Sequence, residues 1–475
     1  MVFNSIFFCF LFFPISYFLY LVVSKIPHIN IRVENLLLVV ISLVFYSYSG
    51  YEHVLILIGL IVFNYIVGVF YNKFKIKKIL VFGIMANIFI LIYFKYLNMI
   101  ISILSDIITH KVDFFVIAAP LAISFIIFHC ISYHMDVWNN NADVSDSIID
   151  FALYLTFFPK LIQGPIVKYK DMKEELQYRK IMFDDCIEGI ERIIIGLCKK
   201  VLVADYLAEI TSQIFSLSMS GIDSLTAWLA VLLFSIQIYM DFSGYSDIAI
   251  GISKLFGFHF QENFNFPYIS KSITEFWRRW HISLGAWFRE YLYIPLGGNR
   301  RGNVYINLII VFLVTGLWHG ASLIYLGWGI YHGIFILIEK FMKKKGIMQN
   351  TTRFTDLVRI CCTFLIVSIG WIAFNISNPA ALLLFFKQLL NIADPQFITL
   401  HFLFFIDEKL MFVLLLFFIL HTFFANDKMR KMLKYYKASS NLFHIFKYCA
   451  MLLLCILIFI SMITNTYTPF LYFQY

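Results

Sequence analysis

The chain has 475 residues, of which 61% are hydrophobic and only 14% are charged. Ordinary soluble domains contain about 45–50% apolar and about 25% charged residues, so this composition excludes a soluble protein. The excess of 38 basic over 29 acidic residues suits cytoplasmic loops that face anionic lipid, and it needs no nucleic-acid partner. The 8 cysteines mostly lie in apolar runs without the paired spacing of zinc or disulfide sites, so we interpret them as small hydrophobic residues.

Apolar runs that could cross a bilayer begin at the N-terminus. The first, at about residues 2–23, has no basic residue before Lys25, so we expect a retained helix and not a cleaved signal peptide. Runs near the span length of about 20 residues follow at 34–49, 54–71, 79–96, 115–133, 186–205, 224–240, 303–319, 321–339, 357–375, 408–424 and 443–464. Shorter pieces near 150–166 and 380–392 are candidate re-entrant or interfacial segments.

This pattern predicts an all-α polytopic membrane protein with about eleven to thirteen spans. No gap is long enough for a soluble domain, so we expect residues 1–475 to form a single membrane-embedded domain. Its expected parts are N-terminal spans over 1–135, a core over 136–340 and C-terminal spans over 341–475.

Four basic clusters indicate which loops face the cytoplasm, because Lys and Arg accumulate on that side of a membrane. They lie at 73–78, 168–180, 340–345 and 428–437. Counting spans from these clusters places the N-terminus outside the cell, and Tyr475 at the C-terminus outside as well.

Polar side chains gather at the end of one apolar run, over residues 237–247. They include two carboxylates, Asp241 and Asp247. One interpretation is an ordinary helix end whose carboxylates meet water or backbone donors. The other is the polar wall of a water-filled cavity, which would make both residues candidates for substrate binding.

A second polar segment follows at residues 263–291. Ser272 and Glu275 have the spacing of a capping box, which predicts a helix that starts at about Ile273. That helix would gather Trp277, Trp280 and Trp287 on one broad side. Such rings favour the headgroup level, so we expect an interfacial helix.

Arg278 and Arg279 in the same segment could reach phosphate groups, either of lipid or of a substrate. An interfacial anchor explains these arginines and the tryptophans but says nothing of His281. That histidine is either a packed core residue or a catalytic one.

His319 is the strongest catalytic candidate, because it ends a long apolar run and is flanked by Gly316 and Gly320. The glycines would let a ligand or another backbone approach the ring closely. Imidazole titrates near neutral pH and can take a proton from a hydroxyl, as acyl transfer requires. Trp318, its neighbour, is a further candidate for substrate binding.

Other chemistries lack support in the sequence. His332 could approach His319 in a helical hairpin, but there is no short spacing of metal ligands such as H-E-x-x-H, so we expect no metal. Neither a G-x-S-x-G elbow nor a Walker loop is present.

Four stretches together resemble the membrane-bound O-acyltransferase (MBOAT) family, and most of all its alginate O-acetylase branch. They are residues 237–247, 262–284, 291–300 and 315–320. Residues 1–5 and 157–166 are similar as well, so the resemblance runs from residue 1 to about 340. The chain departs from the branch at Lys160 and at position 129, where Gln is common, and at 322–323, where Asn-Trp often stands.

The resemblance implies an MBOAT-like helical bundle around a central funnel, in the inner membrane of a bacterium. By motif, His319 matches the family's membrane histidine and His281 its second histidine. The implied reaction moves an acetyl group from cytoplasmic acetyl-CoA, a substrate and not a bound cofactor, to O-acetylate alginate, peptidoglycan or a similar polymer. An SGNH-type extracytoplasmic partner would complete the transfer.

Three alternatives remain at this stage. The similar D-alanine exporter of teichoic-acid modification uses an aminoacyl carrier protein as its donor. A secondary transporter would use the intramembrane His and Asp residues to bind solute or protons, although no internal repeat is present. A scaffold without chemistry would tolerate replacement of both histidines.

Overall fold

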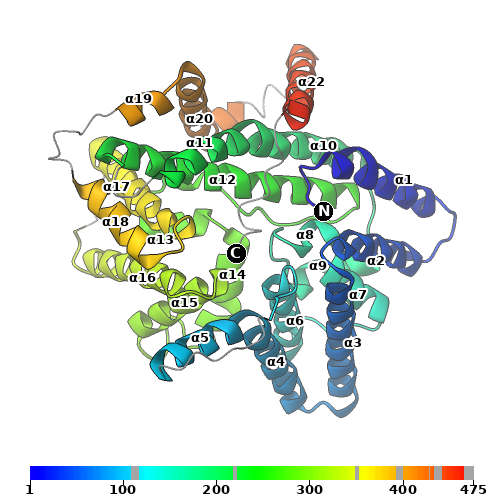
Figure 1. Cartoon of the computed structure of the whole chain (residues 1–475). Helices are drawn as coiled ribbons and strands as arrows, with labels where there is room; N and C mark the ends of the chain where they lie inside the picture. The colour runs from blue at the N-terminus through cyan, green and yellow to red at the C-terminus, as the bar shows by residue number, and fades with distance from the viewer. Residues whose placement is uncertain are drawn as a thin grey trace. The chain divides into compact units, whose positions relative to one another are not determined.

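The structure is a computed structural model, and it describes residues 1–108, 117–217, 222–347, 352–391, 400–426, 428–432 and 441–464. Every regular element among them is helical, as Figure 1 shows. Tyr475, which we expected outside the cell, lies beyond the described residues, as do Lys434 and Lys437 of the fourth basic cluster.

The chain divides into two compact units. Unit 1 consists of Met1–Ile193, Tyr245–Glu262 and Ala286–Pro295, and unit 2 consists of Ile194–Gly244, Asn263–Gly285 and Leu296–Tyr475. Three helices, α10, α12 and α14, contribute residues to both units.

Unit 1 contains the N-terminal helices. They are η1 (Phe8–Phe12), α1 (Phe13–Ser24), α2 (Ile31–Ser47), α3 (Tyr51–Phe74), α4 (Lys77–Leu91), η2 (Ile92–Tyr96), α5 (Leu97–Ile108), α6 (Ile123–Trp138), α7 (Ile148–Thr156), α8 (Phe158–Leu161), α9 (Tyr169–Gln177) and most of α10 (Phe183–Leu197). The predicted re-entrant piece near 150–166 forms the short helices α7 and α8, whose residues are almost all buried.

Unit 2 contains the helices that carry the candidate histidines, together with the C-terminal ones. They are η3 (Cys198–Ala204), α11 (Asp205–Ser216), most of α12 (Ser224–Leu255), η4 (Pro267–Ile269), α13 (Ile273–Arg279), part of α14 (Ile282–Phe288), α15 (Val304–His319), α16 (Leu323–Lys344), α17 (Arg353–Trp371), η6 (Ile372–Phe374), α18 (Pro379–Leu390), α19 (Leu400–Phe405), α20 (Glu408–Ala425) and α22 (Asn441–Thr464). The helix η5 (Arg289–Tyr293) continues α14 in unit 1.

Six of the described helical segments are long and apolar enough to cross a membrane. They are Tyr51–Phe74, Lys77–Ser105, Ser224–Leu255, Arg353–Phe374, Glu408–Ala425 and Asn441–Thr464. Several other predicted spans form shorter helices, since α2, α6 and α10 have 17, 16 and 15 residues. The apolar runs therefore predicted where helices form more reliably than how long they are.

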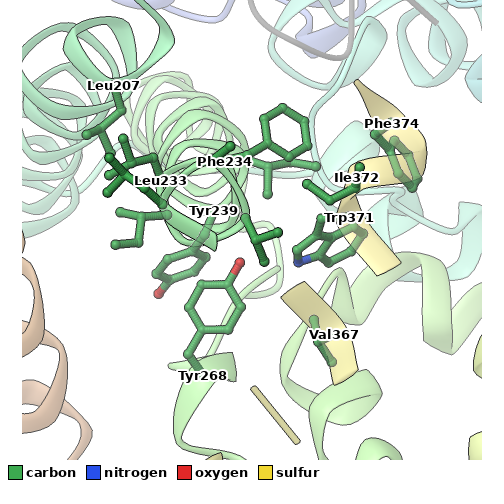
Figure 2. Close-up of a cluster of buried hydrophobic side chains, with 14 of the residues drawn as sticks. Leu207, Leu233, Phe234, Tyr239, Tyr268, Val367, Trp371, Ile372 and Phe374 are labelled. Carbon is green, nitrogen blue, oxygen red and sulfur yellow. The ribbon is translucent and has the colours of Figure 1, made fainter. Parts of the chain in front are cut away.

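The core of unit 2 is built around α12. Within its most apolar stretch 78% of the residues are buried, against 6% for α22. A helix that is apolar on all sides is expected to be covered by neighbours. Figure 2 shows Tyr239 of α12, Tyr268 of η4 and Trp371 of α17 meeting in this core, with the rings of Tyr239 and Tyr268 at 5.3 Å.

Candidate active site

His281 lies at a break between two short helices, where we had expected one continuous helix. The predicted start is confirmed, because α13 begins at Ile273 and the Ser272 hydroxyl caps it by accepting a hydrogen bond from the Glu275 amide at 3.1 Å. The helix then stops at Arg279, and α14 begins at Ile282. His281 has φ +45°, a left-handed conformation that costs a non-glycine residue about 1–3 kcal/mol and is often found at functional sites.

The break also corrects the prediction of an interfacial helix that presents tryptophans to lipid headgroups. Trp280 is 1% exposed and Trp287 is 5% exposed, so both rings are covered by protein. In unit 1, the Trp287 indole donates a hydrogen bond to the Ser132 hydroxyl at 2.8 Å. In unit 2, the ring of Trp280 packs against that of Trp371 at 4.6 Å.

The His281 ring is oriented by the side chain of Asn263. The His281 Nδ1 lies 3.1 Å from the Asn263 Oδ1. The same oxygen accepts hydrogen bonds from the Ser283 amide at 3.2 Å and from its hydroxyl at 2.9 Å. Because a backbone amide can only donate, the atom that faces it must be the amide oxygen, and His281 must donate from Nδ1.

This arrangement leaves the Nε2 of His281 with a lone pair. That atom is buried and has no hydrogen-bond partner in the part of the chain that the structure describes. Burial lowers the pKa of His281 to about 3, so the ring is neutral at physiological pH. The ring of Phe242 stands edge-on to the His281 ring, with 4.7 Å between the two ring centroids. The free Nε2 can accept a proton but, in the neutral ring, cannot donate one.

His319 is the last residue of α15 and is 5% exposed. The rings of Trp328 and Phe374 each lie 5.1 Å from its own, both at steep interplanar angles. A helix C-terminus favours positive charge, by about 0.3–1 kcal/mol at exposed sites and up to about 2 kcal/mol in partly buried ones. An imidazole that takes up a proton here is therefore stabilised by the helix that carries it.

Trp318 connects the two histidines within unit 2. Its ring centroid lies 6.0 Å from that of His281 and 4.8 Å from that of His319. The structure thus brings three of the predicted site residues together, although His281 and His319 are 38 positions apart in the sequence.

The glycines beside His319 make room for α16. A Cβ on Gly316 would overlap the backbone carbonyl of Tyr325, and one on Gly320 would overlap the Tyr325 ring. A Cβ on Gly329 would likewise overlap the carbonyl of Phe312. We had considered that these glycines let either a ligand or another backbone approach His319. The structure shows that a neighbouring chain segment makes this approach.

His332 lies close to His319 but not against it. Both histidine rings lie near the ring of Trp328, that of His319 at 5.1 Å and that of His332 at 4.9 Å. Over the described ranges, no group of three His, Cys, Asp or Glu side chains is placed to hold a metal ion.

The two carboxylates predicted to bind substrate form ion pairs in separate units. In unit 2, Asp241 pairs with the buried Lys200 at 2.6 Å, and Lys200 also reaches Asp205 at 2.8 Å. In unit 1, Asp247 accepts a hydrogen bond from Arg192 at 2.7 Å. Neither carboxylate is therefore an open ligand in this conformation.

The predicted phosphate-binding arginines differ in their surroundings. Arg279 pairs with Glu275 at 2.9 Å and donates to the carbonyl of Asn265 at 3.0 Å. Arg278 is exposed, and the structure gives it no partner among the residues it describes. Lys271, a third basic residue of this segment, pairs with Asp356 at 2.7 Å. Of Lys271, Arg278 and Arg279, Arg278 is therefore the cation available to a ligand.

Three residues that shape the site were not predicted. Asn263 lies in a segment that we had singled out, but its role depends on the chain folding back on itself. The Asn265 amide donates to the Arg279 carbonyl, and the Ile282 amide donates to the Asn263 carbonyl, both at 2.9 Å. Trp328 and Phe374 belong to other helices. Nothing in the local sequence indicates that they would surround His319.

Comparisons with known proteins place these observations in a family. A model of the membrane-bound O-acyltransferase family matches residues 38–382, a range that contains both histidines. The chain is 41% identical over 389 residues to "Probable alginate O-acetylase AlgI" of Pseudomonas putida. The aligned region covers 80% of this chain and 78% of that protein.

Two further relatives act on other polymers, according to their names. The chain is 33% identical over 430 residues to the "Peptidoglycan O-acetyltransferase" of Helicobacter pylori, with 82% of this chain and 80% of that protein covered. It is 31% identical over 238 residues to the "Teichoic acid D-alanyltransferase" of Bacillus subtilis, with coverage of 47% and 60%.

Proposed function

This chain belongs to the membrane-bound O-acyltransferase family, and from that premise we propose that it O-acetylates a bacterial cell-surface polymer with acetyl-CoA as the cytoplasmic donor. It is a multi-pass membrane acyltransferase. The observation that carries the proposal is the placement of His281 and His319 close to the ring of Trp318, in a buried part of unit 2.

In the proposed reaction, a hydroxyl oxygen attacks the carbonyl carbon of the acetyl thioester. His319 accepts the hydroxyl proton as the new C–O bond forms, and the C–S bond then breaks. The proton held by His319 passes to the departing thiolate, which leaves as the free thiol. The charge that His319 carries in between is favoured by its position at the end of α15.

The tautomer of His281 restricts the role that this residue can take in the proposed reaction. Because Nδ1 donates to Asn263, the neutral ring presents only a lone pair, so it does not supply a hydrogen bond to the thioester carbonyl. We assign it to accept a hydrogen bond from the acceptor hydroxyl or to share the proton with His319. Exposed Arg278 remains the proposed contact for the phosphates of the donor.

The acceptor is proposed from the names of the relatives, which act on alginate and peptidoglycan. An SGNH-type partner outside the membrane would pass the acetyl group to the polymer. The bacterial inner membrane, with both termini outside, is the proposed location.

The test uses a deletion strain complemented with variants, together with vesicles that receive radiolabelled acetyl-CoA. His319→Ala should abolish O-acetylation, with normal membrane insertion, and His281→Ala should lower it strongly. His28→Gln, at a position outside unit 2, serves as the control. Acetylation near the wild-type level in His319→Ala would show that the assigned base is wrong.

The same experiment separates the alternatives. Mass spectrometry of the surface polymer would show alanyl esters in place of acetyl esters if the chain resembles the teichoic acid enzyme in its donor. Uptake of unmodified solute without labelled ester would indicate a transporter. Full function in the double variant of His281 and His319 would indicate a scaffold.

A further inference from the structure

Unit 1 contains a group of buried polar side chains that the transfer reaction does not use. Lys160 of α8 and His129 of α6 are 0% exposed, and Gln163 is 2% exposed. The Lys160 Nζ, both His129 ring nitrogens and both Gln163 amide atoms lack a hydrogen-bond partner among the described residues. We name these three side chains the buried basic group.

Two members of the buried basic group meet at Tyr154 of α7. The Lys160 Nζ lies over the Tyr154 ring, 4.3 Å from its centroid, and the His129 ring stands edge-on to it at 5.6 Å. The Tyr154 hydroxyl donates to the backbone carbonyls of His129 and Val167, both at 3.2 Å, so it is already engaged. α6 and α7 pack together in this unit (Figure 1).

The remaining member, Gln163, lies in the tight turn that follows α8. A Cβ on Gly164 would lie 2.5 Å from the Lys160 Cα and 2.7 Å from the Pro159 carbonyl oxygen, so the chain closes back on α8. Gln163 immediately precedes this closure. The turn therefore packs the Gly164 backbone directly against that of Lys160.

The chemistry of the buried basic group favours an anion. A buried ammonium group is costly unless it is paired, and the face of one aromatic ring offsets only part of that cost. The group provides N–H donors from lysine, imidazole and amide, and none of the ion pairs that the structure describes includes Lys160. Its near-complete burial excludes a lipid headgroup or a polymer chain as the occupant.

We propose that Lys160, His129 and Gln163 form a buried binding site for one small monovalent anion of the size of a halide. The single positive charge of Lys160 matches the single negative charge of the ion. The donors of His129 and Gln163 complete its shell. This site lies in unit 1 and is independent of the proposed acyl transfer.

The experiment compares thermal unfolding of the purified, detergent-solubilised full chain in sodium gluconate with unfolding after titration of sodium chloride, bromide or acetate at constant ionic strength. Wild-type protein should show a saturable rise of about 3 °C or more with chloride and bromide. A rise with acetate alone would contradict the halide-sized site and indicate a small carboxylate.

Lys160→Gln should remove the halide-dependent rise, because it keeps a polar side chain of similar length but removes the positive charge. Lys173→Gln is the matched control and should keep the rise, since Lys173 pairs with the exposed Asp143. Equal halide-dependent shifts of the melting temperature in Lys160→Gln and wild-type protein would overturn the proposal. The absence of any shift in the wild-type protein would overturn it as well, since that is the result expected if the Lys160 amine is neutral. If Lys160→Gln does not fold, anomalous scattering from bromide in wild-type crystals decides, and a lack of signal at Lys160 would overturn the site.

Discussion

The Oδ1 of Asn263 accepts a hydrogen bond from the Nδ1 of His281 at 3.1 Å. Because the Ser283 amide donates to the same oxygen, the orientation of the Asn263 side chain and the tautomer of His281 are determined together. Asn263 and His281 are not neighbours in the sequence. The pair exists because the segment before η4 runs alongside the break between α13 and α14, where the Ile282 amide donates to the Asn263 carbonyl at 2.9 Å.

Replacing Asn263 with alanine should slow acyl transfer. Without its acceptor, the His281 ring can rotate and lose the tautomer that exposes a lone pair at Nε2, and a misplacement of about 1 Å can cost about 100-fold in rate. The measurement is the turnover of labelled acetyl-CoA in vesicles, normalised to the amount of folded protein.

Ser283→Ala is the control for Asn263→Ala, because it removes only one of the donors to Asn263 and keeps the backbone amide. We expect a much smaller loss of turnover for Ser283→Ala. If Asn263→Ala retained the wild-type rate, the orienting role of the amide would be wrong.

The burial of neutral His281 predicts a dependence of stability on pH. Its pKa is lowered to about 3 in the folded protein from an ordinary value of 6.5, so the unfolded state binds the extra proton as the pH falls. The contribution to stability is fully present above about pH 6.5 and is lost toward pH 3, by at most about 1.4 kcal/mol per pH unit. His281→Gln should have a shallower loss of melting temperature between pH 7 and pH 4.5. Parallel curves for the two proteins would contradict this.

Gly316→Ala should destabilise the helix pair α15 and α16. The added Cβ would overlap the carbonyl of Tyr325, and overpacking of this kind typically costs about 1–3 kcal/mol. Gly327→Ala in α16 is the matched control, since its Cβ would meet nothing within 4 Å. Removing that glycine should leave stability unchanged or raise it by about 0.5–1 kcal/mol. Thermal unfolding of both variants tests this, and equal melting temperatures would contradict the close approach.

Asp241→Asn should lower stability, because it removes one partner of a buried ion pair with Lys200. Loss of a buried partner costs about 3–5 kcal/mol, and Asp205 offers only partial compensation. Glu188→Gln is the control, since this half-exposed residue pairs with Lys254 and should change stability by about 0–1 kcal/mol. Loss of activity in Asp241→Asn without a change in melting temperature would instead support direct substrate binding.

Local patterns in the sequence predicted several features that depend on few residues. The apolar runs identified the membrane helices, because a spanning helix must satisfy its own backbone and expose apolar side chains to lipid. The spacing of Ser272 and Glu275 predicted the start of α13 at Ile273. The sequence also identified His319, at the end of α15, as a functional candidate, because a polar side chain is costly within an apolar run.

The tertiary structure decided what surrounds those features. The left-handed backbone at His281 arises where the chain changes direction, and helical periodicity alone continued the helix through it. The glycines beside His319 receive α16 and Tyr325 because two helices pack there closely. The partners Lys200 for Asp241 and Phe374 for His319 come from distant segments. Contacts of this kind depend on three-dimensional packing, so the sequence by itself determined the membrane class and the catalytic candidates, and the fold determined their neighbours.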